Sequence, residues 1–408
     1  MTNTKTFSYE ALDAAGTTLK GTIDSESAEA AANSLAGQRL VPLSVSASGQ
    51  GLQRDIKIPG FGGRTTLKDL AILSRQFASM TSSGLTLLRT LAILEEQTGK
   101  PKLKVAVGEV RSDVQGGATL SSAMARHGEH FPPLMVNMIK AGEAGGFLDD
   151  ALARCAKMYE SDAALRAKIK SAMTYPVIVL IFSLLLGTGV ILFIVPVFAK
   201  MFSQLGGKLP LPTQVMVTLS NNMWWAMPMI IIGSIVGLRW YRKSLRDSYA
   251  FRLKTDRIKL RLPVFGPLFK KLAISRWARN LGTLLGVGVP ILQALEIVGG
   301  TSGNAMVTAA MDDVREAVRG GSQMSKPLAD HPLFPAMVVQ MLEVGEETGR
   351  TSEMLDKVAD FYDQEVETAT DSLTAALEPL LVVLMGVVIG TMVICLYLPM
   401  FSIYQHIH

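Results

Sequence analysis

The sequence has few of the side chains with which enzymes bind metals or form covalent intermediates. Its 408 residues include two cysteines and five histidines, the latter at positions 127, 130, 331, 406 and 408. His127 and His130 are close enough for a metal pair, but no third ligand is evident, so a solvated pair is favoured. The two histidines of the tail are typical of a chain end. No metal site is predicted.

Motifs for nucleotide and redox chemistry are missing as well. The "GGK" at 206–208 lacks the first glycine and the final hydroxyl residue of G-x-x-x-x-G-K-[ST], and neither H-E-x-x-H nor C-x-x-C occurs. Cys155 falls in a charged helical stretch and Cys395 in an apolar run, so a disulfide between them is not expected. The sequence predicts a protein that is not an enzyme and holds no cofactor.

Apolar sequence, in contrast, is abundant. Hydrophobic residues make up 49% of the chain and charged residues 18%, and the mean hydropathy is +0.30. Three uncharged runs, 174–199, 209–238 and the residues after Glu378, each supply the roughly 20 apolar residues that a spanning helix needs. The predicted spans are 174–199, 222–241 and 379–403. Their interiors carry no Asp, Glu, Lys, Arg or His, which argues against an ion-coupled transporter. The N-terminus lacks an apolar leader, so insertion is expected to rely on these internal segments.

The placement of lysine and arginine predicts the orientation of these spans. Three basic residues precede the first span and nine lie at or after the end of the second, from Arg239 to Arg261, whereas the intervening loop, 200–221, contains only Lys200 and Lys208. The positive-inside rule then places the N-terminus and the segment after the second span in the cytoplasm, and the C-terminus in the periplasm. The juxtamembrane cluster after the second span is expected to touch anionic lipid rather than nucleic acid, because no nucleic-acid motif accompanies it. It consists of Arg239, Arg242, Lys243 and Arg246.

The sequence also contains an internal duplication. "IKAGEAGG" begins at Ile139 and "LEVGEETG" at Leu342, and the residues around them align over more than a hundred positions. The repeat unit is a cytoplasmic domain followed by a membrane helix, so the two copies are parallel and the unmatched second span returns the chain to the cytoplasm. The aligned pairs include Gly84 and Gly288, Gly142 and Gly345, Glu143 and Glu346, Gly146 and Gly349, Pro176 and Pro379, and Pro196 and Pro399.

Hydrophobic periodicity separates the cytoplasmic part into modules. Residues 66–172 and 272–374 have apolar residues at helical spacing with Gly and Pro punctuation, which predicts two helical bundles. Residues 1–50 form a small mixed module: an expected hairpin turning at Ala15-Gly16, a short helix, and a strand at "VPLSVS". The Gly-rich stretch 51–65 is predicted to be a flexible linker.

The repeated Gly-Glu-x-x-Gly phrase is interpreted as a structural joint. Gly142 is expected to end a helix in the left-handed conformation, and Gly146 to free the backbone before the next helix. Glu143 is then placed to cap or face the N-terminus of that next helix. The same applies to Gly345, Glu346 and Gly349 in the second copy. A docking or cation site is the alternative, but one carboxylate per joint is too few for a metal ion.

Several of these stretches together resemble a known family. "FSYEALDAAGTTLKGTI", the pair "SGLTLLRTLAIL" and "VGVPILQALEIV", the doubled "GE..G" and the ending "GVVIGTMVICLYLPMF" are similar to the inner-membrane platform proteins of type II secretion systems and type IV pilus machines. The resemblance covers essentially the whole chain, and "YLPMF" is more similar to the pilus branch.

The resemblance implies an all-α membrane protein with two tandem six-helix cytoplasmic bundles and three transmembrane helices, beside the small mixed module. It implies a non-enzymatic platform that couples a hexameric assembly ATPase to the insertion of pilin subunits into a fibre. Other partners that it implies are a retraction ATPase, pseudopilins, inner-membrane alignment proteins, lipids and further copies of the chain. A secretion platform is the first alternative, and a channel or transporter built on parallel repeats is the second.

Overall fold

The computed structural model describes residues 5–12, 18–25, 28–37, 40–47, 65–204, 211–263 and 265–404. The chain divides into two compact units, Met1–Gly62 and Gly63–His408.

The first unit is a small sheet with one helix. Its elements are β1 (Lys5–Leu12), β2 (Thr18–Ser25), α1 (Ala28–Gly37) and β3 (Val41–Ala47). The strands are antiparallel in the order β2-β1-β3. Ala31 and Leu35 of α1 are fully buried, which gives the unit an apolar centre. The turn expected at Ala15-Gly16 and residues 51–64 of the predicted linker lie outside the described residues.

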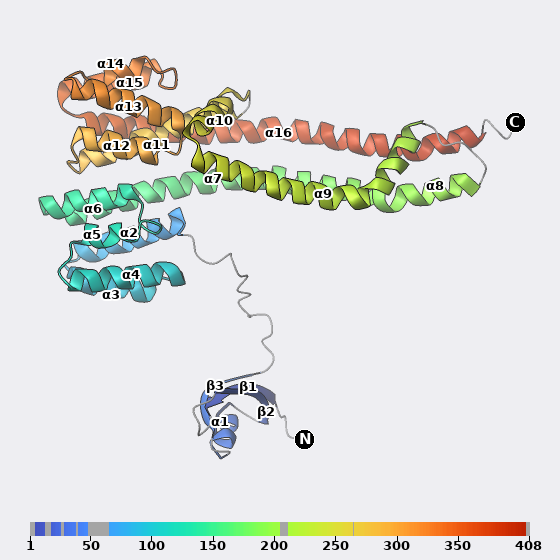
Figure 1. Ribbon diagram of the computed structural model, residues 1–408, viewed down its shortest axis with the longest axis horizontal. Helices are drawn as coiled ribbons and strands as arrows, with labels where there is room; N and C mark the ends of the chain where they lie inside the picture. The colour runs from blue at the N-terminus through green and yellow to red at the C-terminus, as the bar shows by residue number, and fades with distance from the viewer. Residues whose placement is uncertain are drawn as a thin grey trace. The chain divides into compact units, whose positions relative to one another are not determined.

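The second unit contains six helices that recur in the same order, which confirms the predicted duplication (Figure 1). The first copy consists of α2 (Leu67–Ser82), α3 (Leu87–Gln97), α4 (Pro101–Gln115), α5 (Leu120–Ala125), α6 (Pro133–Gly145) and α7 (Leu148–Gly189). The second consists of α11 (Gly266–Gly286), α12 (Ile291–Thr301), α13 (Ala305–Arg319), α14 (Ser325–Ala329), α15 (Ala336–Thr348) and α16 (Thr351–Tyr404).

Local sequence explains where these helices begin. Thr66 accepts a hydrogen bond from the Asp69 backbone N–H while the Asp69 carboxylate accepts one from the Thr66 N–H, which is a complete capping box for α2. Pro101 occupies the first position of α4, where its missing N–H leaves no bond unmade. Asn304 caps α13 through its side chain.

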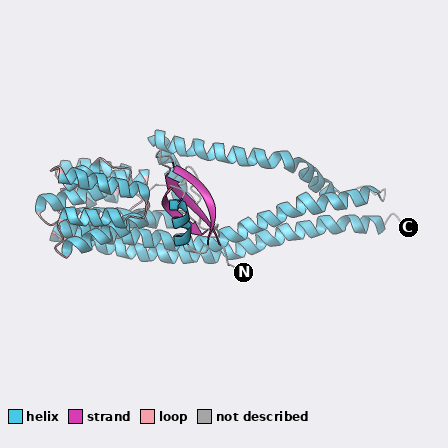
Figure 2. Ribbon diagram, turned by 90° about the horizontal axis from the view of Figure 1, so that it is seen from below, coloured by secondary structure: helices cyan, strands magenta, loops and turns pink. Residues whose placement is uncertain are grey.

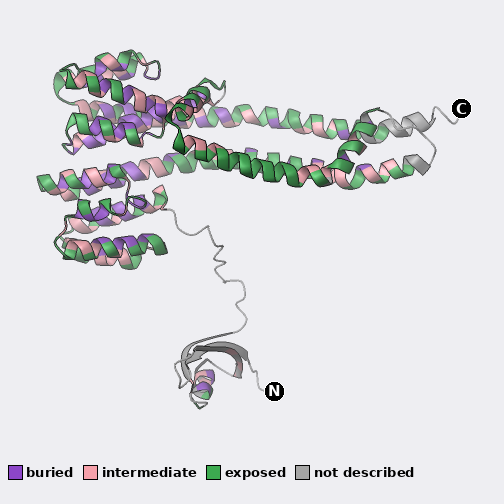
Figure 3. Ribbon diagram, viewed as in Figure 1, coloured by how far each residue is buried: buried purple, intermediate pink, exposed green. Residues whose placement is uncertain are grey.

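Buried apolar residues of the two bundles form one cluster, and Figure 3 marks the buried residues of each bundle in purple. Trp277 of α11 is 1% exposed, and its ring meets Phe334 edge-on with centroids 4.7 Å apart. A second cluster lies where α7, α11 and α16 meet, and it joins Leu165 to Leu268, Val366 and Leu373. The repeats are therefore packed against each other through apolar contacts.

The last helix of each bundle continues into an apolar run without a break. Leu148–Met201 and Thr351–Ile394 are both long and apolar enough to cross a membrane. The first path consists of α7, the π-helix η1 (Val190–Ile194) and α8 (Val195–Gln204). α16 alone has 54 residues, about 80 Å at 1.5 Å per residue. The predicted bundle limits at 172 and 374 thus fall inside single helices. α7 continues past Pro176 even though this proline cannot donate a bond to the Ala172 carbonyl.

The third apolar run belongs to α9 (Leu211–Asp247), which is followed by α10 (Tyr249–Arg261). α9 bends by 64° between its segments Thr213–Met223 and Trp225–Asp247. Pro228 explains the bend, because its ring lacks an N–H for the carbonyl of the residue four positions earlier and clashes with it. Figure 2 shows α7–α8 and α16 running side by side, and α9 contacts both near η1 and α8.

The segment predicted as a loop, 200–221, is largely helical in the structure. α8 extends to Gln204 and α9 begins at Leu211, while residues 205–210 lie outside the described part. Pro212 does not prevent this, because the first turn of a helix tolerates proline. The predicted limits of the second span, 222–241, likewise fall within the longer helix α9.

Gly187 sets the approach of α7 to α16 within the apolar runs. A Cβ at this position would lie 3.5 Å from Met392 Cε and 3.6 Å from Val388 Cγ1, whereas a Cβ at Gly189 would meet nothing within 4 Å. The larger side chain of a Gly187→Leu variant would force the two helices apart.

We expect Gly187→Leu to lower the free energy of unfolding by about 1–3 kcal/mol through overpacking. Gly189→Leu is the matched control and should leave stability unchanged. Thermal unfolding of the full chain in lipid nanodiscs measures both, and equal losses for the two variants would show that α7 and α16 do not pack here.

Candidate functional site

Each repeat contains a joint at which a glutamate near the end of one helix holds the N-terminus of a short helix. In the first joint, Glu143 Oε1 accepts a hydrogen bond from the Leu120 N–H (2.5 Å), and its Oε2 accepts from the Ser121 N–H (3.0 Å) and hydroxyl (2.5 Å). In the second, Glu346 accepts from the N–H groups of Met324 (2.6 Å) and Ser325 (3.0 Å). Both carboxylates thus satisfy backbone donors that a helix start leaves unpaired.

The predicted target of these carboxylates is wrong. Glu143 was expected at the helix that follows it, α7, but it binds the start of α5, which precedes it in sequence. The reason is geometric: the Cα–Cβ bonds of a helix tilt toward its own N-terminus, away from the helix that follows. The first turn of α7 instead carries its own acids, Asp149 and Asp150.

The predicted roles of the two glycines in each joint are exchanged in the structure. Gly146 and Gly349 are the left-handed residues that end α6 and α15, with φ of 75° and 69°. Gly142 lies inside the last turn of α6, where a Cβ would approach Ala151 Cβ to 2.7 Å. At Gly345 a Cβ would come within 2.9 Å of Thr351 Cα. These two positions therefore lack a side chain because the next helix packs directly on them.

Gly84 and Gly288 come just after α2 and α11, with φ of 82° and 75°. A left-handed conformation at a helix end favours glycine. The equivalent helices of the two copies therefore end on the same kind of turn.

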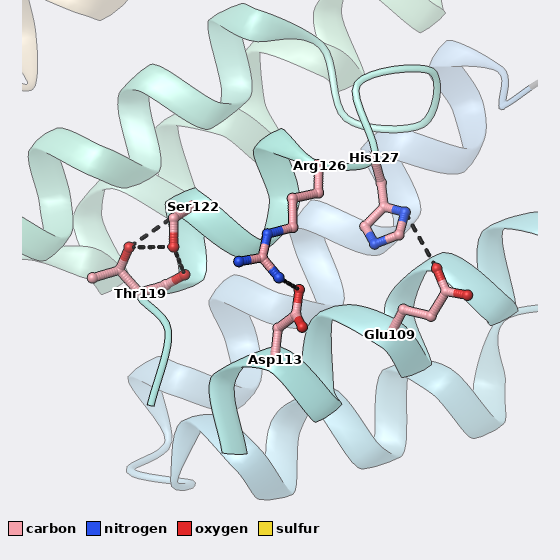
Figure 4. Close-up of polar contacts among 6 residues, drawn as sticks. All are labelled: Glu109, Asp113, Thr119, Ser122, Arg126 and His127. Carbon is pink, nitrogen blue, oxygen red and sulfur yellow. Dashed lines mark hydrogen bonds and ion pairs between the residues drawn. The ribbon is translucent and has the colours of Figure 1, made fainter. Parts of the chain in front are cut away.

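Polar contacts tie α5 to its neighbours (Figure 4). Thr119 caps α5 by accepting from the Ser122 N–H at 3.3 Å. Beyond the helix, Arg126 Nη1 lies 2.9 Å from Asp113 Oδ2, and His127 Nδ1 lies 3.4 Å from Glu109 Oε2, both acids belonging to α4.

The histidine contact recurs in the second copy, where His331 Nε2 lies 3.3 Å from Asp313 Oδ2. The histidines at these positions thus face one carboxylate of the preceding long helix rather than a set of ligands. Within the described residues, no group of three or more His, Cys, Asp or Glu side chains is arranged to hold a metal ion.

The cysteine of the first bundle, Cys155, is unreactive. Cys155 is fully buried, with its Sγ 3.5 Å from Met138 Sδ. Burial raises the pKa of the Cys155 thiol to about 12. Because the thiolate is the nucleophile, this side chain is not reactive at neutral pH.

A repeated ion pair was not predicted from the sequence. Arg75 of α2 binds Glu160 of α7 through two nitrogens, at 2.7 and 2.5 Å. Its counterpart Arg279 binds Asp360 at 2.8 Å and Asp363 at 2.7 Å. Arg75 aligns with Arg279 and Glu160 with Asp363. The opposite charges at both pairs of aligned positions could therefore have predicted this ion pair.

Polar contacts also join the two copies to each other. Arg276 Nε lies 3.2 Å from Asp162 Oδ1, and Lys168 Nζ lies 2.6 Å from Glu367 Oε2. A cavity of about 200 Å³ opens beside the first pair. With the apolar cluster around Leu165, these contacts hold α7 against α11 and α16 where the bundles approach the apolar runs.

The remaining predicted residues lie along the long helices. Pro176 is inside α7 and buried, Pro379 is exposed in α16, and Pro399 lies in the last part of α16. Pro196 follows η1 by two residues, and the π-helix accommodates the backbone bond that the proline cannot make. All four cluster residues are exposed on α9, namely Arg239, Arg242, Lys243 and Arg246.

Comparison with known proteins finds the same duplication. The family described as "Type II secretion system (T2SS), protein F" matches residues 73–196 and again 277–399. Its N-terminal domain, "Type II secretion system protein F, N-terminal domain", matches residues 1–46.

Curated relatives match the chain over nearly its full length. It is 42% identical to the type IV pilus assembly protein PilC of Thermus thermophilus, covering 97% of this chain and 98% of that one. Identity to the PilC of Myxococcus xanthus is 40%, over 98% and 95%. Identity to the type II secretion system protein F of Xanthomonas campestris is 33%, over 97% and 98%.

We expect the double variant Glu143→Gln and Glu346→Gln to lower stability by about 1–3 kcal/mol per joint, because an amide leaves one backbone donor without an acceptor. Glu347→Gln, at an exposed neighbouring position, is the control and should be neutral. Thermal unfolding of the purified chain gives the comparison. If the double variant folds with normal stability but cells that carry it lose the function of the protein, the joints are docking sites instead.

Proposed function

Because this chain belongs to the type II secretion system protein F family, we propose that it is the non-enzymatic inner-membrane platform of a type IV pilus machine. In this role it couples a cytoplasmic assembly ATPase to the insertion of pilin subunits into the growing fibre. The observation that carries the proposal is the near full-length similarity to pilus assembly proteins. The platform of a type II secretion system is the second candidate. It is supported by the 33% identity to a type II secretion system protein F, and it ranks second because this identity is lower than the 42% and 40% to PilC proteins.

The proposal includes three membrane spans and a defined topology. The spans are the α7–α8 path, α9 and the apolar part of α16, with the N-terminus and both bundles in the cytoplasm and the C-terminus in the periplasm. The distribution of Lys and Arg along the sequence supports this orientation. The exposed basic cluster on α9 then lies at the cytoplasmic surface, where it contacts anionic lipid.

The continuous helices supply a mechanical reason for the assignment. Any displacement of the first bundle moves α7, and any displacement of the second moves α16, because no flexible segment separates bundle from span. The energy has to come from a partner, since the sequence contains no phosphate-binding loop. A platform driven by a separate ATPase fits this combination better than an enzyme does.

A channel or transporter is the candidate from another class. The apolar runs carry no Asp, Glu, Lys, Arg or His in their interiors, and ion-coupled transporters usually need such a residue there. A flux assay in proteoliposomes separates the two classes.

The partners in this proposal are a hexameric assembly ATPase, a retraction ATPase, pilins or pseudopilins, inner-membrane alignment proteins and further copies of the chain. We assign the ATPase contact to the N-terminal module, residues 1–50, together with the first bundle. The Gly-rich sequence that follows the module supports this choice, because such sequences give an attached domain reach.

The purified chain should hydrolyse no ATP, and it should bind the assembly ATPase of its own organism in a pull-down from detergent. Deletion of residues 1–50 should weaken that binding strongly, whereas the full chain serves as control. ATP hydrolysis by the chain alone would overturn the platform proposal. Undiminished ATPase binding after the deletion would overturn only the placement of the contact.

A further inference from the structure

The second bundle carries an extra helix that the first lacks among the described residues. α10 packs against α11 and α13 (Figure 1). Asp256 of α10 is buried, and its Oδ2 accepts a hydrogen bond at 3.0 Å from the N–H of Ala305, the first residue of α13. Leu260 of α10 packs on the core. α10 thus covers the corner between the start of α13 and the side of α11.

Among the described residues of the second unit, no helix covers the equivalent corner of the first bundle. Pro101, the counterpart of the fully buried Ala305, is exposed. Ile72 of α2 is 49% exposed and Val105 of α4 is 59% exposed. The counterparts of these two, Arg276 and Ala309, are half-buried.

A groove of about 260 Å³ runs along this corner, lined by Asp69, Ile72, Gln76, Gln97, Lys100 and Leu103. We call the groove together with the exposed residues of 101–105 in α4 the open corner. Ile72 lines the groove, and Val105 lies one helical turn after Pro101 on the same side of α4. Exposed apolar side chains next to a groove mark a surface suited to an apolar helix face.

The charge around the open corner decides which kind of helix fits. Lys100 lines the groove and pairs with its one carboxylate, Asp69, at 2.5 Å, so these two charges offset each other. The positive charge comes from three further lysines, all exposed, on the adjoining turns of α2 and α4. The four residues at the equivalent positions of the second bundle are uncharged. The lysines are Lys68, Lys100, Lys102 and Lys104, and their counterparts are Leu272, Asn304, Met306 and Thr308.

The same charge excludes α10 of a second copy as the occupant. α10 carries five basic residues against the single acid Asp256, so it would be repelled by the lysines. The backbone contact that holds Asp256 is also missing, because Pro101 has no N–H to donate. An acidic side chain arriving at this position would meet the lysines instead.

We propose that the open corner binds an acidic amphipathic helix of a partner protein, in the position that α10 occupies on the second bundle. The apolar face of that helix packs on Ile72 and Val105, and its carboxylates face the lysines. The proposal follows from the comparison of the two repeats, and it holds whether the chain serves pilus assembly or secretion.

The test uses a peptide made from the chain's own template. It has the sequence of residues 249–261, with the five basic residues reversed in charge and a hydrocarbon staple on the outer face. The native basic sequence with the same staple is the matched peptide, and circular dichroism establishes that both are helical. The five changes are Arg252→Glu, Lys254→Glu, Arg257→Glu, Lys259→Glu and Arg261→Glu.

Fluorescence anisotropy with the full chain in nanodiscs should show that the acidic peptide binds at least about tenfold more tightly than the basic one. Ile72→Glu and Lys102→Glu should each weaken binding of the acidic peptide by about tenfold or more. Leu88→Glu, on α3 of the same bundle at a 41% exposed position outside the groove, should leave it unchanged. If Ile72→Glu fails to fold, Val105→Glu replaces it.

Three results would overturn the proposal. The first is a helical acidic peptide that does not bind, and the second is binding that Ile72→Glu and Leu88→Glu reduce equally. The third is a change in the oligomeric state of the chain caused by Ile72→Glu, which would make a second copy the occupant.

Discussion

The uninterrupted backbone of α7 and α16 is the constraint on which the rest of the second unit depends. Each of these helices closes a bundle and then continues as an apolar helix, so one helix belongs to both parts. In the parts that precede the apolar runs, α7 and α16 are held together by the apolar cluster around Leu165 and Val366 and by the ion pair Lys168–Glu367. The bundles cannot rotate independently of the spans without breaking helix or interface.

The joints make each bundle a rigid body on the end of its long helix. In each joint a half-buried glutamate accepts hydrogen bonds from the first residues of the short helix. One glycine lets the next helix pack closely, and a second glycine, in the left-handed conformation, ends the helix. All three recur in both copies at Glu143, Gly142 and Gly146 and at their counterparts. The copies differ at the corner that α10 covers in one and that stays open in the other. The two copies are therefore similar bodies with different surfaces.

Sequence alone predicted the duplication, the helical bundles and the apolar runs, because periodicity and repeat alignment depend on few long-range contacts. It identified Glu143 and Gly142 as structural but misplaced their roles. The direction of a side chain at a helix end, and the packing of Ala151 against Gly142, follow from tertiary geometry that spacing does not carry. The loop expected at 200–221 was too long, since polar and proline-containing sequence can still extend a helix. The covering role of α10 could not be predicted, because its basic residues were explained by orientation in the membrane.

In the proposed platform, movement of a bundle reaches the membrane through a continuous helix. Insertion of four glycines after Ala172 interrupts α7 between bundle and span while leaving both sequences intact. The decisive measurement is the number of fibres on cells that carry this variant, with ATPase binding by the same protein as the control for folding. Fibres should disappear while ATPase binding persists. Normal fibre numbers with the glycines in place would show that the continuous helix does not transmit the movement.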